Sequence, residues 1–367
     1  MEKHFGKLSR GCALCFVGKK SVLFVTGICP RNCIYCPISP ERKNKDVVYI
    51  NELKTKNTKN ILQEINLSNS SGVGITGGDP LSKLSLTISL IKKFKKEFGK
   101  SFHIHLYTSL NLLDDKSIKK LQKSGLDELR IHPDLFDRKN WGKLNLMSKK
   151  FKEVGIEIPV LPKYEKGIID LIEFAKNKVD FFNLNELEYA INKEKIYAEK
   201  KWKVHQNYGV AGSEKLAKKI LNSFKKLRIH YCSARFKDSV QFRERLKQRA
   251  KKVAKKFDKI TSDGLLVHGA VSGEKNKLIE YRKQSPVSIS SSMFSVLPKS
   301  QRKSEEFREV KKELIKMKKP FFYDDKKSRI IFGIDTAKKL AKKFKGIFIT
   351  EEYPTSDSQE VYKEVLS

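Results

Sequence analysis

Cys29-Pro-Arg-Asn-Cys33-Ile-Tyr-Cys36 directly follows the apolar run Ser21-Val-Leu-Phe-Val-Thr-Gly27. The run predicts a buried strand, and the cysteine segment predicts a loop that leaves the end of this strand. Three thiolates on one short loop can bind one face of a metal centre, but they do not complete a tetrahedral site. A structural zinc site takes four ligands, whereas a cubane iron-sulfur cluster can take three thiolates and keep one iron open. The spacing therefore favours an iron-sulfur cluster, with zinc or unliganded thiols as the alternatives.

The spacing Cys-x3-Cys-x2-Cys, with an aromatic residue before the last Cys, resembles the cluster loop of the radical S-adenosylmethionine (radical SAM) enzymes. The resemblance implies that Cys29, Cys33 and Cys36 hold a [4Fe-4S] cluster whose open iron is chelated by SAM. It also implies one-electron cleavage of SAM to methionine and a 5′-deoxyadenosyl radical that abstracts hydrogen from a substrate. By the same resemblance, Tyr35 lies beside the adenine of SAM.

The segment Gly77-Gly-Asp-Pro80 ends a second predicted strand, residues 71–76. Two glycines let the backbone approach a ligand closely, and a carboxylate beside them can accept hydrogen bonds from an ammonium group. As an isolated string the segment would be an ordinary turn. It resembles the second radical SAM signature, Gly-Gly-Glu-Pro, which binds the methionyl amino group of SAM. The resemblance implies that Gly77, Gly78 and Asp79 orient SAM, with Asp79 in place of the usual Glu.

Strands and helices alternate along the following hundred residues. This spacing predicts right-handed β-α-β crossovers and a parallel sheet. Six such units resemble the partial (βα)6 barrel of radical SAM enzymes, a TIM-like α/β fold, over residues 21–190. The predicted strands are 102–107, 128–132, 155–159 and 179–184, and the predicted helices are 58–67, 84–98, 116–123, 143–154 and 167–176.

Barrels of this kind hold ligands at the carboxyl ends of their strands. In related enzymes such positions contact the carboxylate and ribose of SAM, and the backbone of residues 156–159 would contact the adenine. A satisfied core histidine is the alternative for His132, and His103 and His105 are predicted to be packed strand residues. The polar residues that this rule selects are Thr108, Ser109, His132, Asn183 and Asn185.

Cys12-Ala-Leu-Cys15 precedes the first strand and adds a second pair of thiols, and Cys232 is the one remaining cysteine. Together the three are candidates for an auxiliary iron-sulfur cluster or, with a histidine, for a zinc ion. Structural or unliganded thiols are the alternative, because sequence does not show which thiols are close in space. Five of the six cysteines lie between residues 12 and 36, which is typical of a metal site in a reducing compartment.

The charge of the chain is strongly positive, with 77 Lys and Arg against 42 Asp and Glu and a formal net charge of +35. This charge predicts either an acidic partner such as RNA or a lysine-rich solvated surface. A long predicted helix at 237–257 favours the solvated surface slightly, because few aromatic residues are interleaved for base stacking. The cations of this helix are Arg243, Arg245, Lys247, Arg249, Lys251 and Lys252.

The sequence predicts four parts. They are an N-terminal CxxC segment (1–20), the core barrel (21–190), a basic lid and helical extension (191–260) with a short strand at 228–231, and a small C-terminal α/β module (261–367) with a polar stretch at 285–293. The N-terminus has no apolar leader, and no run approaches the ~20 apolar residues that span a bilayer, so we expect a cytoplasmic protein without a membrane partner.

The predicted function is a radical SAM oxidoreductase or transferase that receives electrons from a flavodoxin- or ferredoxin-type donor. Net charge favours RNA, in particular tRNA, as the substrate. The position of the motifs near the N-terminus resembles the pyruvate formate-lyase-activating enzymes and favours an activase that makes a glycyl radical in, or otherwise modifies, another protein. A non-catalytic zinc- and nucleic-acid-binding protein is the hypothesis from another class. The sequence names no catalytic residue.

Overall fold

The computed structural model describes residues 3–147, 150–205, 208–273 and 305–367. The chain forms two compact units, Met1–Lys252 and Val253–Ser367, which are described separately. The predicted segment 1–20 and residues 191–252 of the predicted extension contribute strands and helices to the first unit, whereas residues 253–260 belong to the second. The predicted polar stretch at 285–293 lies outside the described residues.

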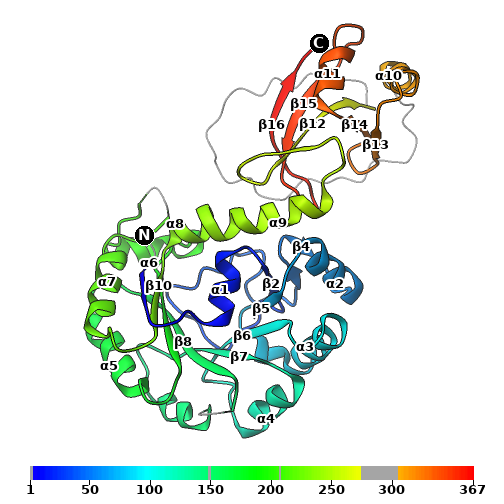
Figure 1. The fold of residues 1–367 in the computed structure, drawn as a ribbon. Helices are drawn as coiled ribbons and strands as arrows, with labels where there is room; N and C mark the ends of the chain where they lie inside the picture. The colour runs from blue at the N-terminus through cyan, green and yellow to red at the C-terminus, as the bar shows by residue number, and fades with distance from the viewer. Residues whose placement is uncertain (1–2, 148–149, 206–207, 274–304) are drawn as a thin grey trace. The chain divides into compact units, whose positions relative to one another are not determined.

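The first unit is built on a curved sheet in the strand order β1-β10-β9-β8-β7-β6-β5-β2-β3-β4 (Figure 1). Strands β2 and β5 to β10 run parallel to one another, and β1, β3 and β4 pair antiparallel at the two edges. The strands are β1 (Lys3–Phe5), β2 (Lys20–Phe24), β3 (Tyr49–Ile50), β4 (Leu53–Lys54), β5 (Gly72–Thr76), β6 (His103–Ser109), β7 (Glu128–His132), β8 (Glu153–Val160), β9 (Phe181–Glu186) and β10 (Ile229–Cys232).

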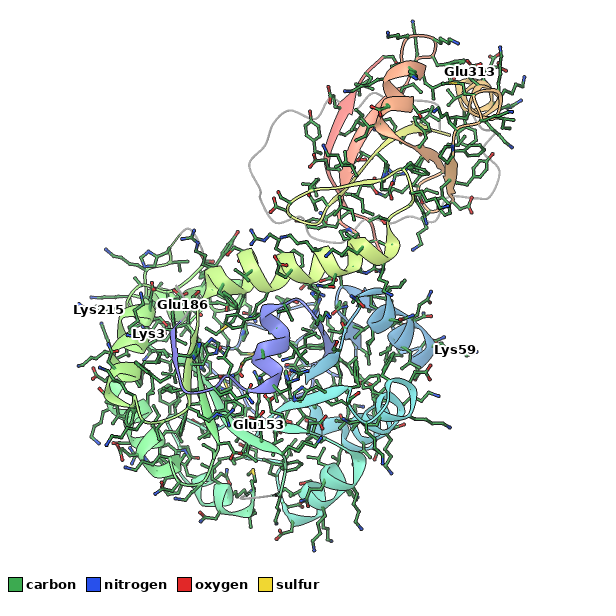
Figure 2. All side chains as sticks on the ribbon, viewed as in Figure 1. Lys3, Lys59, Glu153, Glu186, Lys215 and Glu313 are labelled. Atoms are coloured by element: carbon green, nitrogen blue, oxygen red, sulfur yellow. The ribbon has the colours of Figure 1, made fainter. Side chains whose placement is uncertain are left out.

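Helices cover the outer face of this sheet (Figure 1). Their apolar stripes pack on the strands; in α4, for example, Ile118 and Leu121 join the main hydrophobic core. Lysine side chains such as Lys59 and Lys215 point outward from them (Figure 2). The helices and helical turns are α2 (Thr58–Leu67), η1 (Pro80–Lys83), α3 (Leu84–Phe98), α4 (Asp115–Ser124), η2 (Trp141–Met147), α5 (Glu165–Ala175), η3 (Ile191–Lys193), α6 (Glu194–Glu199) and α7 (Ser213–Ser223).

The inner face of the sheet carries polar side chains, because residues alternate between the two faces of a strand. In β7, Leu129 and Ile131 belong to the hydrophobic core, whereas Glu128, Arg130 and His132 share the other face. All five residues except the last are buried. The strand is therefore covered on both faces, as parallel strands normally are, but one of its faces is lined with charge.

Two helices fill the open side of the sheet, whose edges do not pair. Helix α1 (Arg10–Phe16) lies inside the arc of strands, and α9 (Arg243–Val253) runs from α8 (Ala234–Phe236) toward β4 and α2 (Figure 1). A π-helix, Lys237–Phe242, joins α8 to α9. Arg249 forms a buried bidentate ion pair with Glu64 of α2, and Arg245 pairs with Glu52 between β3 and β4. Helix α9, which follows β10 in the chain, is thus bound to α2 and the β3–β4 end of the sheet.

The alternation of strands and helices predicted for residues 71–184 is confirmed, with one exception. The predicted helix at 143–154 is wrong, because residues 141–147 form a 3-10 helix and β8 begins at Glu153. Trp141, Leu144 and Met147 are its buried residues, a spacing of three that suits a 3-10 helix. The strand predicted at 228–231 is β10, which pairs parallel with β9 as a seventh parallel strand among the described residues.

The second unit is an antiparallel sheet in the order β13-β14-β12-β15-β16, with β11 paired to β12. Two helices supply Phe307, Val310, Leu314, Ala337 and Leu340 to a separate hydrophobic core. The elements are β11 (Lys259–Ile260), β12 (Leu266–Ser272), α10 (Glu305–Lys316), β13 (Phe321–Asp324), β14 (Arg329–Phe332), α11 (Ile334–Leu340), β15 (Ile347–Glu352) and β16 (Glu360–Val365). Within the described ranges, we find no helix with the length and apolarity needed to cross a bilayer.

Candidate active site at the carboxyl ends of the strands

The cysteine loop, residues 29–36, follows the carboxyl end of β2. Its three cysteines are free and partly buried. The Arg31 N–H donates to the Cys29 sulfur at 3.4 Å, and the Cys36 N–H donates to the Cys33 carbonyl at 3.2 Å. Burial raises the pKa of the Cys29 and Cys33 thiols. Metal binding at this loop therefore releases protons, since the ligand is the thiolate.

The segment Gly77-Gly-Asp-Pro80 lies directly against the start of this loop. The Gly78 N–H donates to the Thr26 carbonyl at 2.7 Å, and the Asp79 N–H donates to the Ile28 carbonyl at 2.9 Å. A Cβ added at Gly78 would lie 2.4 Å from the Ile28 carbonyl oxygen, so only glycine allows this approach. The absence of side chains at these glycines thus lets the backbone that leads into the cysteine loop pack directly against them.

The Asp79 carboxylate is buried and accepts four hydrogen bonds. One oxygen accepts from the Leu81 N–H at 3.0 Å and the Thr108 hydroxyl at 2.7 Å. The other accepts from the Ser109 N–H at 3.1 Å and the Ser109 hydroxyl at 2.7 Å. A carboxylate offers about four acceptor positions, so this one is fully used within the chain. Any contact of Asp79 with an ammonium group therefore has to share or replace one of these bonds.

Tyr35 and His132 form a hydrogen-bonded pair. The Tyr35 hydroxyl lies 2.9 Å from His132 Nε2, and His132 Nδ1 lies 2.9 Å from the Glu157 carbonyl. Because a carbonyl only accepts, Nδ1 carries the proton and Nε2 accepts from the tyrosine. Burial, followed by the charge of Arg31, lowers the pKa of His132 to about 4, so the imidazole is neutral near pH 7.

Arg31 attaches the cysteine loop to the chain that follows β7. Its guanidinium donates to the His132 carbonyl at 2.8 Å and forms an ion pair with Asp134 at 2.9 Å. The arginine side chain is only 7% exposed, so this ion pair is largely shielded from water. Both Arg31 and Tyr35 therefore reach the end of the same strand.

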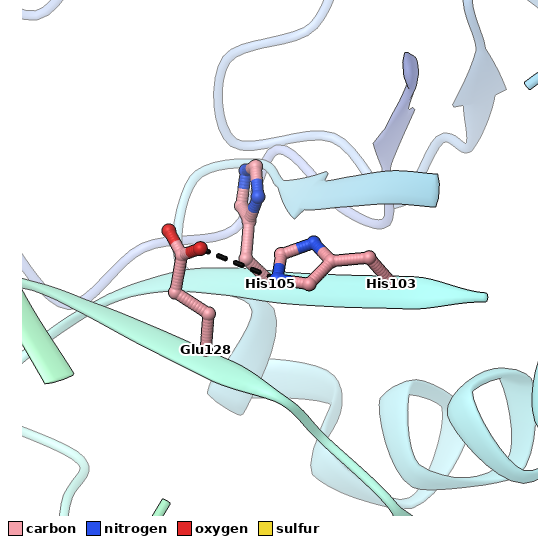
Figure 3. Close-up of side chains that lie close together, drawn as sticks. All are labelled: His103, His105 and Glu128. Carbon is pink, nitrogen blue, oxygen red and sulfur yellow. Dashed lines mark ion pairs between the residues drawn. The ribbon is translucent and has the colours of Figure 1, made fainter. Parts of the chain in front are cut away.

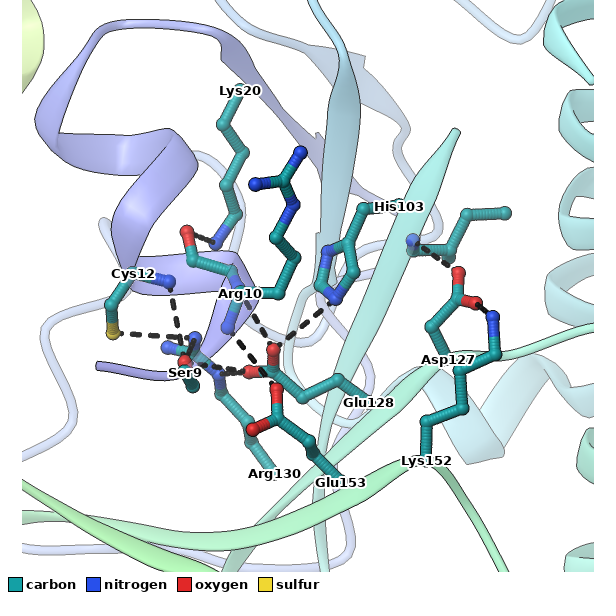
Figure 4. A network of polar contacts seen from close by, with 12 residues as sticks. Ser9, Arg10, Cys12, Lys20, His103, Asp127, Glu128, Arg130, Lys152 and Glu153 are labelled. Atoms are coloured by element: carbon teal, nitrogen blue, oxygen red, sulfur yellow. Dashed lines mark hydrogen bonds and ion pairs between the residues drawn. The ribbon is translucent and has the colours of Figure 1, made fainter. Parts of the chain in front are cut away.

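A second cluster of polar side chains, the luminal network, lies inside the barrel around Arg130 (Figure 4). Arg130 is 3% exposed and forms ion pairs with Glu128 and with Glu157, the latter at 2.7 Å. It also donates to the Tyr107 hydroxyl at 3.0 Å and the Ser9 hydroxyl at 3.0 Å. The network holds α1 inside the barrel, because the Gly11 N–H donates to Glu128 at 2.9 Å and the buried Lys20 donates to the Gly11 carbonyl at 3.0 Å.

Cys12 belongs to the luminal network. Its sulfur accepts from Arg130 at 3.4 Å and from the Asn183 amide at 3.3 Å. Burial alone would raise the pKa of Cys12, but Arg130 and a hydrogen bond from His230 overcome it and lower the pKa to about 6. Arg130 and His230 therefore hold this buried sulfur as a thiolate near neutral pH.

The three cysteines predicted for an auxiliary site are in different surroundings. Burial raises the pKa of Cys15, and the Cys232 sulfur accepts a hydrogen bond from Gln241 at 3.5 Å. Over the described ranges, neither these three sulfurs nor those of Cys29, Cys33 and Cys36 lie within 4.8 Å of one another, the spacing of a single-ion site, so an auxiliary cluster stays a prediction. The structure thus gives Cys12 a different set of partners, Arg130 and Asn183.

His103, His105 and Glu128 do come within that distance of one another (Figure 3). His103 Nε2 lies 3.3 Å from Glu128, and the Nδ1 atoms of both histidines are buried without a hydrogen-bond partner. However, Glu128 already pairs with the buried Arg130 guanidinium. A fixed positive charge next to the carboxylate would repel a divalent ion. We therefore assign these residues to the luminal network rather than to a metal centre.

The structure sorts the predicted site residues into three places. Gly77, Gly78, Asp79, Thr108 and Ser109 form one group beside the cysteine loop, and Tyr35 and His132 form a second. Asn183 and Asn185 instead donate to Glu157, at 2.9 and 3.0 Å, and so belong to the luminal network. Sequence analysis missed Arg31, Arg130 and Glu157, although the alternation Glu-Leu-Arg-Ile-His in β7 already places Arg130 on the polar face of its strand.

The similarity to known proteins agrees with this geometry. A family model of the radical SAM superfamily matches residues 23–175, which include the cysteine loop and the Gly77-Gly-Asp-Pro80 segment. A protein of Methanocaldococcus jannaschii, provisionally named a glycyl-radical enzyme activating enzyme, is 42% identical over 284 residues, which cover 73% of this chain and 75% of that protein. The chain therefore belongs to the radical SAM superfamily.

Solved structures resemble the chain only distantly. Methylornithine synthase is 15% identical with a TM-score of 0.35, and the match covers 48% of this chain and 60% of that one. The radical S-adenosylmethionine methyltransferase TsrM from Kitasatospora setae is 9% identical with a TM-score of 0.36, over 49% and 36% of the two chains. At these scores neither likeness carries an argument about this protein.

Family membership confirms the predicted partial-barrel fold and the two predicted cofactors, a [4Fe-4S] cluster and SAM. The residues present fit the cluster by donor type and number. Three soft thiolates on one loop suit iron, and a cubane cluster has one more iron than this loop has cysteines. The donor set thus leaves one iron of a cubane without a protein ligand.

Proposed function

We propose that this protein is an activating enzyme that makes a glycyl radical in a partner protein. When bound, the cluster and SAM supply reductive cleavage of SAM to a 5′-deoxyadenosyl radical, which abstracts a hydrogen atom. The observation that carries the proposal is the 42% identity, over three quarters of its length, to a relative with this provisional name. The proposal further includes a flavodoxin- or ferredoxin-type protein as the electron donor.

The residues have separate roles in this proposal. Cys29, Cys33 and Cys36 hold the cluster, and the Gly77-to-Asp79 segment, pressed against their loop, forms the adjoining wall of the SAM site. Asp79 acts mainly by fixing Ser109 and Thr108, because its carboxylate is saturated by their hydrogen bonds. Tyr35 is held by His132 where the adenine would lie.

The RNA hypothesis has weaker support. Its motives are the net charge of +35 and the basic helices after Glu214, one of which carries six cations. Four of these six are used within the chain: Arg245 pairs with Glu52, Arg249 with Glu64, and Arg243 and Lys247 with Glu244. Only Lys251 and Lys252 remain for phosphate contacts without breaking an ion pair described here. This helix therefore adds little support for RNA beyond the net charge itself.

The proposal is tested by following deuterium. The anaerobically reconstituted protein is supplied with SAM, dithionite and the protein fraction of source cells grown on α-deuterated glycine. Hydrogen abstraction from a glycine residue yields 5′-deoxyadenosine that is heavier by one mass unit, together with an organic-radical signal in the protein. Unlabelled 5′-deoxyadenosine alone would retain the radical SAM chemistry and overturn the activase assignment. Labelled product from an equally deuterated RNA fraction, and not from protein, would favour RNA modification.

A further inference from the structure

Two side chains of the cysteine loop attach it to the barrel, and each comes from one of the two sequence intervals between its cysteines. Arg31 lies between Cys29 and Cys33, and Tyr35 lies between Cys33 and Cys36. Both side chains reach the carboxyl end of β7, where Arg31 contacts the His132 carbonyl and Tyr35 contacts the His132 ring. The loop is thus attached to the barrel from two points that no cysteine occupies.

The anchor that receives Arg31 is itself well fixed. The Asp134 carboxylate oxygen that is not paired with Arg31 accepts hydrogen bonds from the Phe136 N–H at 2.9 Å and the Asp137 N–H at 3.2 Å. The Asp134 carbonyl accepts the Trp141 indole N–H at 2.9 Å. An arginine fork that binds a carboxylate and a carbonyl at once has little freedom to move, and it is 7% exposed here. The position of residues 29–33 is consequently fixed relative to β7.

Arg31 also places a positive charge next to a sulfur ligand. Its backbone N–H lies 3.4 Å from the Cys29 sulfur, and its guanidinium favours the charged form of Cys33, which Cys36 and Asp134 disfavour. Tyr35 also lies close enough to Cys33 for a hydrogen bond, but its single proton is committed to the neutral His132. The fixed positive charge on the Cys33 side of the loop therefore comes from Arg31, and its partner Asp134 offsets part of it.

We propose that Arg31 is a positioning residue that holds the cysteine loop on β7 and raises the reduction potential of the cluster bound there. This inference rests on the proposed function only in requiring a cluster at the three cysteines. A cluster that gains one electron becomes more negative, so a fixed cation beside a ligand stabilises its reduced form more than its oxidised form. The electron-accepting step thereby becomes easier.

The positioning role is tested on the protein without metal. The rates at which iodoacetamide alkylates Cys29, Cys33 and Cys36 are measured by peptide mass spectrometry in wild type, Arg31→Gln and Asp134→Asn. Both variants release one end of the attachment, and we expect alkylation to accelerate by about fivefold or more. Arg138→Gln, which removes an arginine–aspartate pair elsewhere on the same side of the barrel, is the matched control and leaves the rates unchanged. Wild-type rates in both test variants would overturn the positioning role.

The electrostatic role is tested on the reconstituted protein. The midpoint potential is determined by titration with dithionite and mediators, with the reduced cluster detected by electron paramagnetic resonance. We expect Arg31→Gln to shift the potential negatively by about 59 mV, a tenfold change in a one-electron equilibrium. Arg31→Lys keeps the charge and stays near the wild-type value, and Asp134→Asn, which removes a negative charge, does not shift it negatively.

The outcomes separate this inference from the function on which it rests. A wild type that binds iron and cleaves SAM, with equal potentials in wild type and Arg31→Gln, would overturn the electrostatic role alone. A wild type that binds no iron would overturn the proposed function and the electrostatic role together, while alkylation would still decide the positioning role. If Arg31→Gln does not fold, the alkylation rates of Asp134→Asn decide the positioning role. The midpoint potentials of Arg31→Lys and Asp134→Asn, compared with each other, then decide the sign of the charge effect.

Discussion

The carboxyl ends of the strands and the lumen of the barrel both contain cysteines close to charged residues, but the protonation states of these cysteines differ. At the carboxyl ends, Cys29 and Cys33 are thiols whose pKa is raised by burial. In the lumen, Cys12 is a thiolate surrounded by Arg130, Asn183 and His230. The first set of sulfurs is available to a metal, and the last sulfur already has its partners. Short cysteine spacing thus identifies a ligand only when the neighbouring residues leave the sulfur free.

The two regions also differ in how charge is used. The luminal network pairs Glu128 and Glu157 with Arg130 in a space closed by α1, so each buried charge has a partner. Removing one partner of such a network leaves an uncompensated buried charge, which is far more costly than the network is stabilising. At the carboxyl ends, the attachment by Arg31 leaves the cysteine loop partly exposed. We therefore predict that the lumen contributes to stability and that the strand ends bind the ligands.

The largest effect that separates the two regions is expected from Cys33→Ala. This variant should lose SAM cleavage by more than about 100-fold, because removing a ligand exceeds the 10- to 100-fold cost of outer-shell changes. Cys12→Ala should retain the iron content of the wild type per folded protein. Iron, sulfide and 5′-deoxyadenosine are measured on the same anaerobic samples. Equal iron loss in both variants would assign a metal to the lumen and erase the distinction.

Arg130→Met tests the stabilising role of the lumen. The substitution leaves Glu128, Glu157 and the Cys12 thiolate without their shared cation, and we expect unfolding free energy to fall by about 3–5 kcal/mol. Arg138→Met is the control, because Arg138 is 59% exposed and its ion pair with Asp170 contributes about 1 kcal/mol or less. Urea unfolding of the metal-free proteins gives both values. Similar losses of unfolding free energy in the two variants would show that the ion pairs of the luminal network stabilise the fold no more than an exposed ion pair does.

His132 makes the carboxyl-end region sensitive to acid. Its pKa is lowered to about 4 in the folded chain, below its ordinary value of 6.5, so the unfolded chain binds the extra proton between these values. Stability from the neutral imidazole is therefore complete above pH 6.5 and is lost as the pH falls toward 4, by up to about 3 kcal/mol. His132→Gln keeps a donor and an acceptor but cannot titrate. Unfolding measured at pH 7 and pH 4.5 should show a steeper loss in wild type than in this variant, and parallel losses would contradict the assignment.

Local patterns predicted the elements of the barrel well. The run before Cys29, the glycine pair at residue 77 and the strands at 102–107 and 128–132 could be found because each depends on neighbours within a few residues. The same information placed Thr108 and Ser109 at the edge where Asp79 lies. It did not predict that all three are hydrogen-bonded to one another, since that pairing depends on the register of β5 and β6.

The lumen could not be predicted in the same way. The contact of Gly11 with Glu128 joins residues 117 positions apart, and a sequence without relatives offers no signal for it. The polar residues at every second position of β6, β7 and β9 did carry a partial signal, because parallel strands are normally covered on both faces and a polar face then lines an interior. That pattern identifies the polar face, but it does not show that α1 fills the space in front of it.

Asp79 is the residue for which the difference between the two regions is smallest. It lies at the carboxyl ends of the strands, yet its carboxylate is saturated with hydrogen bonds, like the polar groups of the luminal network. Asp79→Asn keeps the acceptor for Leu81 and Thr108 but presents an amide to the Ser109 N–H, so about 2 kcal/mol of stability should be lost without any ligand present. Asp46→Asn, at an exposed ion pair with Lys56 and Lys83, should leave the stability nearly unchanged. If Asp79→Asn retains wild-type stability and loses only SAM affinity, Asp79 acts on the ligand directly. The Asp79 carboxylate would then give up hydrogen bonds within the chain in order to bind a ligand. Saturated hydrogen bonding would therefore no longer distinguish the luminal network from the carboxyl ends of the strands.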